Sequence, residues 1–79
     1  MKTIKTSIKQ FLNVTATANA TTINIEKDFG DTYYAIARGN IDGISVKIET
    51  KPVKSINAKK IAKIAKGKGY NVNAPYGWL

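Results

Sequence analysis

Between residues 53 and 69, apolar and lysine side chains recur with the period of an α-helix. At about 100° per residue, the apolar positions share one arc of roughly 160°; they are Ala58, Ile61, Ala62, Ile64 and Ala65. Ser55 is a candidate N-cap, because its hydroxyl can accept a hydrogen bond from a first-turn amide. Gly67 can adopt the left-handed conformation that ends many helices. The pattern therefore predicts an amphipathic helix bounded by Ser55 and Gly67.

A second helical period occurs at the start of the chain. Apolar residues recur there at i, i+4, i+7 and i+8, namely Ile4, Ile8, Phe11 and Leu12. This spacing predicts a helix over residues 3–13 that packs its stripe on the core. A membrane-surface helix is the alternative, but the stripe is short and lacks Trp. The Thr- and Ala-rich residues 15–22 are predicted to be a connection or the start of a strand.

Alternation with a period of two predicts three strands between the helices. They cover residues 22–27, 32–38 and 44–49. Residues 28–31 are predicted to form a turn and residues 39–43 a hairpin loop. Pro52 ends the third strand, since proline cannot donate a hydrogen bond to the sheet.

This order predicts a small α+β fold with the elements α-β-β-β-α. We expect a three-stranded antiparallel sheet with both helices on one face, followed by an aromatic C-terminal tail. A chain of 79 residues suits one small basic domain, residues 1–79, in which the tail, residues 70–79, can have a separate role.

Aromatic and basic side chains mark two further candidate contact regions. The uncovered sheet face is expected to carry Tyr33, Arg38 and Lys47, with Tyr33 and Lys47 as cross-strand neighbours. An aromatic beside a cation can stack on a base in single-strand binders, although such pairs are also common as ordinary surface residues. In the tail, Tyr76 and Trp78 can pack on the core, stack on a base or anchor a partner.

The charge is strongly positive and unevenly distributed. The net charge is +8, which favours polyanionic partners. All five acidic residues lie between Glu26 and Glu49, whereas residues 51–79 carry seven lysines and no acid. Like charges four residues apart, such as Lys59 and Lys63, weaken a helix by a few tenths of a kcal/mol. Their presence suggests that an anion meets this face; a lysine surface that only maintains solubility is the alternative.

The residue types argue against catalysis and cofactors. The chain has no His and no Cys, so it lacks a ready general base near neutral pH, an imidazole ligand and a thiol nucleophile. Its carboxylates do not cluster as hard cations require. We therefore predict a protein that is not an enzyme and that binds no metal or cofactor. No stretch has the length of a signal-peptide core or a membrane span, so we expect a cytoplasmic location and no membrane partner.

The lysines of the helix predicted between Ser55 and Gly67 resemble a known signature. The sequence Lys59-Lys60-Ile61-Ala62-Lys63 is similar to the KKxAK signature of double-stranded-RNA-binding domains, over about ten positions. That family also has the order α-β-β-β-α. The resemblance implies that Lys59, Lys60 and Lys63 contact phosphates across a groove, helped by the positive end of the helix dipole.

Two functions remain open from the sequence. The first is a non-catalytic nucleic-acid-binding module, monomeric or a small homo-oligomer, whose helix contacts the phosphate backbone. Its candidate ligands are Lys54, Lys59, Lys60, Lys63, Lys66 and Lys68. The second is a small inhibitor, because the composition is similar to phage or mobile-element proteins of the anti-CRISPR or anti-restriction type. Such an inhibitor would bind an acidic protein surface or a nucleoprotein, in a bacterial cell or a phage-infected host. The sequence does not distinguish DNA from RNA, or single from double strands.

Overall fold

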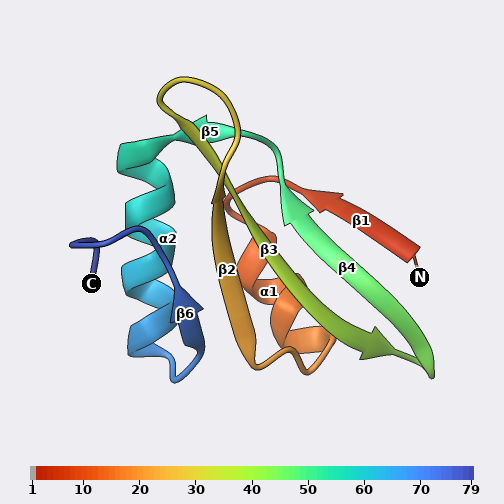
Figure 1. Ribbon diagram of the computed structural model, residues 1–79. Helices are drawn as coiled ribbons and strands as arrows, with labels where there is room; N and C mark the ends of the chain where they lie inside the picture. The colour runs from red at the N-terminus through yellow and green to blue at the C-terminus, as the bar shows by residue number, and fades with distance from the viewer. Residues whose placement is uncertain (1) are drawn as a thin grey trace.

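The computed structural model describes residues 2–79, in which one mixed sheet of six strands is the largest feature (Figure 1). The strands are β1 (Lys2–Thr6), β2 (Thr22–Lys27), β3 (Thr32–Ile41), β4 (Ile44–Thr50), β5 (Val53–Lys54) and β6 (Asn71–Asn73). Five of them lie in the order β1-β4-β3-β2-β6. The sixth, β5, pairs with the first two residues of β3, Thr32 and Tyr33. The edge strands are parallel to their neighbours, β1 to β4 and β6 to β2, whereas β3 is antiparallel to all its partners.

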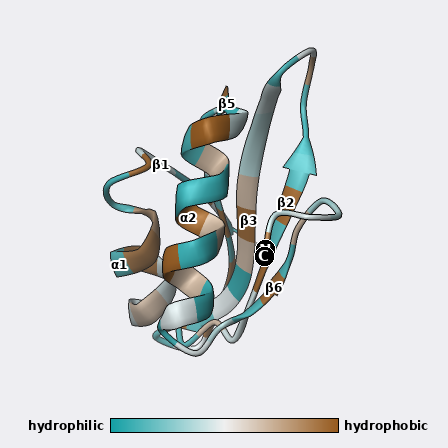
Figure 2. Cartoon of the chain, turned by 90° about the vertical axis from the view of Figure 1, so that its left-hand side faces the viewer, coloured by the Kyte–Doolittle hydropathy of each residue, from teal (hydrophilic) through white to brown (hydrophobic). Residues whose placement is uncertain are grey.

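Both helices lie against the same face of this sheet (Figure 2). They are α1 (Phe11–Thr17) and α2 (Ser55–Gly67). The core lies between the two layers, where alternate residues of the central strands meet the apolar sides of the helices. Phe11, Ile23 and Ile48 are its largest fully buried apolar side chains.

The predicted α-β-β-β-α order and three-stranded antiparallel sheet are wrong. The structure is a small α+β fold with a six-stranded mixed sheet. Residues 2–6 form a strand, and the first helix begins only at Phe11. Ile4 and Ile8 are four positions apart, and because four is an even number they fit a strand period as well as a helical one. Ile4 pairs with Ile48 of β4, and long-range pairing decides between the two periods.

β5 and β6 are the two further strands that the sequence did not predict, and β6 lies in the tail. Val72, at the centre of β6, pairs with Ile23 and is half-buried on the helix side of the sheet. A three-residue strand has too short a pattern to be recognised. In contrast, the prediction of residues 22–27 as a strand is confirmed, and β4 ends at Thr50, before Pro52.

Two local predictions shift by a few residues. The loop predicted at 39–43 is only the two-residue turn Asp42-Gly43, with φ of 53° and 81° between the paired Ile41 and Ile44. Two successive positive φ values are typical of a type I′ hairpin turn, whose twist suits the flanking strands.

The ends of α2 also differ from the prediction. Lys54, not Ser55, is the N-cap residue, because β5 leads directly into the helix and the Ser55 amide donates to the Asp31 carbonyl at 3.0 Å. Gly67 is the last helical residue, and the glycine with positive φ after the helix is Gly69, at 97°.

Candidate nucleic-acid interface

The basic side of α2 is the strongest candidate for a binding surface. Its buried residues Ala58, Ile61, Ala62 and Ala65 hold the helix on the sheet. Four exposed lysines cover the outer side, and we call them the lysine face: Lys59, Lys60, Lys63 and Lys66. Ile64, which the sequence pattern assigned to the apolar arc, is 51% exposed.

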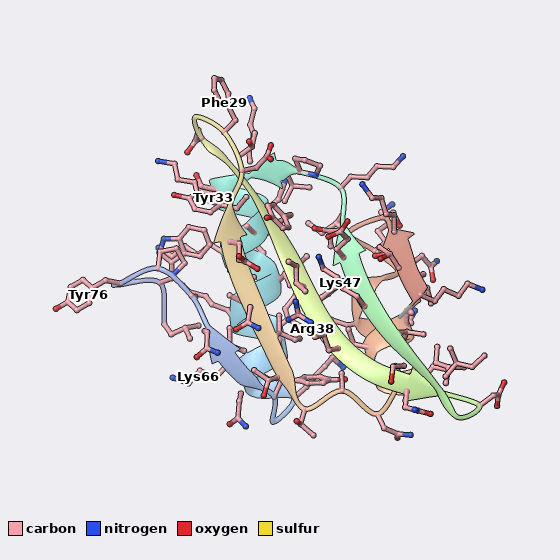
Figure 3. The ribbon with its side chains drawn as sticks, turned by 45° about the vertical axis from the view of Figure 1, so that its right-hand side comes forward. Phe29, Tyr33, Arg38, Lys47, Lys66 and Tyr76 are labelled. Atoms are coloured by element: carbon pink, nitrogen blue, oxygen red, sulfur yellow. The ribbon has the colours of Figure 1, made fainter. Side chains whose placement is uncertain are left out.

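Two further lysines continue the positive charge of the lysine face beyond both ends of the helix. Lys54 precedes the helix and Lys68 follows it, and both are exposed. Three members of the face, Lys59, Lys63 and Lys66, follow one another at i, i+4 and i+7, which puts them in one row. Lys66 emerges beside β6 in Figure 3. All six predicted phosphate ligands are therefore exposed and adjacent to one helix.

No acidic residue among residues 2–79 forms an ion pair with these lysines. Neither helix contains an acidic residue. Among residues 2–79, the only ion pairs within 4.0 Å join Glu49 to Lys5 at 3.6 Å and to Lys47 at 3.7 Å. Glu49 lies on the sheet face away from the helices, because it alternates along β4 with the buried Val46, Ile48 and Thr50. The lysine face is therefore an uncompensated positive surface.

The uncovered sheet face carries a second, smaller basic pair. Arg38 of β3 and Lys47 of β4 are directly opposite in the register, and Figure 3 shows their side chains together in front of the sheet. Lys47 is neutralised in part by Glu49. This face thus mixes both signs of charge, unlike the outer side of α2.

Tyr33 does not belong to that face, and its predicted proximity to Lys47 is wrong. Residues 33 and 38 are an odd number apart, so their side chains point to opposite faces of β3. Tyr33 pairs with Lys27 and Val53 and lies on the helix side. Its ring meets that of Trp78 edge to face, with 4.9 Å between centroids and 65° between planes.

The aromatic tail divides into a packed and an exposed part. Trp78 is half-buried and packs against the core, and its amide donates to the Pro75 carbonyl at 3.2 Å. Tyr76 is fully exposed and points away from the molecule (Figure 3). The packing of Trp78 brings it next to α2, where it lines a hollow of about 330 Å³ with Ser55, Ile56 and Lys59.

Sequence reasoning missed two features of these surfaces. The first is the proximity of Trp78 to Lys59, which only the folded tail creates. The second is Phe29, which is 84% exposed at the tip of the β2–β3 loop (Figure 3). The signal for Phe29 was available, since an aromatic residue within an Asp-Phe-Gly-Asp turn has no strand neighbours to cover it.

Comparisons with known proteins give no family for this chain. A scan against models of protein families finds no match, and a search of curated proteins finds no similar sequence. The element order differs from the one that the double-stranded-RNA-binding resemblance implies, and Lys59 is in the second turn of α2 rather than at its start. In residues 2–79, no helix is long and apolar enough to cross a membrane, and no three carboxylates are grouped as a metal site would need.

Proposed function

We propose that this protein binds nucleic acid through the lysine face of α2 and catalyses no reaction. One observation carries the proposal: four exposed lysines share a 13-residue helix that has no acidic residue and no ion-pair partner in the described part of the chain. Such a surface attracts a polyanion, and the phosphate backbone is the polyanion that lysines bind most generally.

The dimensions of the helix suit a phosphate backbone. At 1.5 Å per residue, α2 is about 20 Å long, which equals the axial length of about six nucleotide steps. Lys54 and Lys68 extend the positive surface at its two ends. About four to six phosphates can therefore be engaged at once, which predicts a slope of log K against log salt of about −4 to −5 for duplex DNA. Because lysines on phosphates do not read bases, little sequence discrimination is expected.

The test replaces Lys59, Lys60 and Lys63 together by Gln, which has nearly the same helix propensity. Affinity for labelled DNA and RNA oligonucleotides is measured by fluorescence anisotropy over a range of salt concentrations. We expect affinity at low salt to fall by orders of magnitude and the salt slope to shrink by about three. The melting temperature should stay the same or rise slightly, because like-charge repulsion within the helix is removed.

A matched control separates a local effect from a change in total charge. Replacing Lys2, Lys9 and Lys27 by Gln also removes three exposed charges, all outside α2. This control should keep most of the affinity. Equal losses in the two triple variants would show that only net charge matters, and unchanged binding in the α2 variant would refute the proposal.

The exposed aromatic residues favour a second candidate function. Phe29 and Tyr76 are 84% and 104% exposed and point outward at separate places (Figure 3). Aromatic side chains of this kind anchor protein interfaces, which fits a small phage or mobile-element inhibitor that binds an acidic protein or a nucleoprotein. Capture of such a partner after nuclease treatment, and its loss on Phe29→Ala or Tyr76→Ala, would support this alternative. Either function is compatible with the cytoplasm of a bacterial cell or an infected host.

A further inference from the structure

Trp78, the only Trp of the chain, lies at one end of the lysine face. The indole is half-buried and is held from one side by the ring of Tyr33, 4.9 Å away. The two rings cross at 65°, so they are not stacked on each other. The indole also lines the hollow of about 330 Å³ beside Ser55, Ile56 and Lys59. It is therefore both fixed in position and accessible from this hollow.

The hollow combines an aromatic wall with a cation. Lys59 lines it and also begins the row that continues with Lys63 and Lys66 along α2. The volume is at the lower end of the range for sites that hold small organic groups. A strand that placed one base in the hollow could set its following phosphates along this row. Stacking on an aromatic ring next to a basic track is how single-strand binders hold bases without reading their sequence.

We propose that this hollow stacks one unpaired base on Trp78, so that the protein binds single-stranded nucleic acid in preference to duplex. The inference rests on the proposed function, because the phosphates of the same strand occupy the lysine face. A duplex cannot offer the flat face of an internal base, which its neighbours cover, whereas a single strand can. Stacking of one base corresponds to an affinity for single strands that is about 5- to 150-fold higher than for duplex.

The fluorescence of Trp78 provides the first test, and it needs no variant. The full chain is titrated with oligo-dT, with oligo-U and with a duplex DNA of equal length, at low salt. Single strands should quench the emission and shield it from acrylamide, and the duplex should do neither. Anisotropy with labelled oligonucleotides should give the single-strand preference stated above.

Variants then assign the preference to Trp78. Trp78→Leu keeps an apolar side chain at the site and should bind single strands and duplex equally, with an unchanged salt slope. Trp78→Phe retains a ring and should keep part of the preference. Tyr34→Leu is the matched control, because Tyr34 is a half-buried aromatic on the opposite face of β3 from Tyr33 and does not line the hollow, and its preference should equal that of the parent.

The failure of this inference differs from the failure of the proposed function. Salt-dependent binding with equal affinity for single strands and duplex, and with no change in Trp78 emission, would overturn the stacking inference while the lysine face remained supported. Binding to no oligonucleotide at any salt concentration would overturn both. If Trp78→Leu does not fold, the emission of the parent protein still decides the question.

Discussion

Gly39, in β3, lies against the end of α1 with no room for a side chain between them. A Cβ atom at this position would lie 2.8 Å from the Cβ of Ala18 and would overlap the Ala18 carbonyl oxygen. The same carbonyl accepts a hydrogen bond from the Asn40 amide at 2.9 Å. The absence of a side chain at residue 39 therefore lets the end of α1 dock on the strand.

We expect Gly39→Ala to lower the free energy of unfolding by about 1–3 kcal/mol, because backbone and not a flexible side chain must move. Chemical denaturation measures the change. Gly67→Ala is the control, since no atom of residues 2–79 outside its immediate surroundings lies within 4 Å of that Cβ and Gly67 is helical. It should stabilise the protein by up to about 1 kcal/mol. A neutral Gly39→Ala would show that α1 is not held at this distance.

The side chain of Phe11 gives a second prediction for a single residue. It is fully buried and is the largest such side chain in the core. Phe11→Ala should cost about 3–5 kcal/mol, which approaches the whole stability expected of a domain this small. A thermal melt close to that of the parent would contradict the central position of Phe11 in the core.

Among the elements, those made by neighbouring segments could be predicted from the sequence, and those made by distant ones could not. The alternation in β2 and β4 is regular, and each packs one apolar face on the core. The position of α2 was also predicted to within two residues, and its four lysines are exposed as expected. In contrast, β1 and β6 exist because they pair with strands far away in the chain, and their own sequences are too short to show a period.

The candidate site shows the same division. The row of lysines is a property of one helix, so its spacing was visible in the sequence. The hollow at Trp78 joins the tail to the first turn of α2, so no local spacing shows it. Tyr33 differs, because its odd spacing from Arg38 along β3 is enough to place it on the opposite face. Side chains brought together by tertiary packing leave no local pattern.

The edge strand β1 gives a prediction at the scale of an element. Deleting residues 1–12 removes β1 together with Phe11 and Leu12, and it exposes the edge of β4. We expect the truncated chain to lose its cooperative thermal transition, followed by circular dichroism. Lys5→Gln is the control within β1, since the Lys5 side chain is exposed and Glu49 keeps its ion pair with Lys47; it should change stability by less than about 1 kcal/mol. A truncated protein that melts like the parent would mean that β1 contributes little.

At the scale of the whole molecule, thirteen basic residues against five acidic ones leave an excess of positive charge, and the basic side chains repel one another. Of the five acidic residues, only Glu49 forms ion pairs within the described residues. Screening by salt should therefore weaken the repulsion between basic residues more than it weakens attraction. The melting temperature should therefore rise by a few degrees between about 10 mM and about 200 mM NaCl. A fall over this range would indicate that attractive pairs dominate the electrostatic energy.

The placement of β1 and β6 at opposite edges of the sheet also has a consequence for the folding rate. The β3–β4 hairpin closes through the two residues Asp42-Gly43, so its contacts form locally. The two parallel edges instead bring residue 2 to residue 46 and residue 22 to residue 71. Closing such long loops is entropically slow, and pairings of this kind move refolding from microseconds toward milliseconds or seconds. We therefore expect the β3–β4 hairpin to be the folding nucleus and the docking of β1 and β6 to limit the refolding rate.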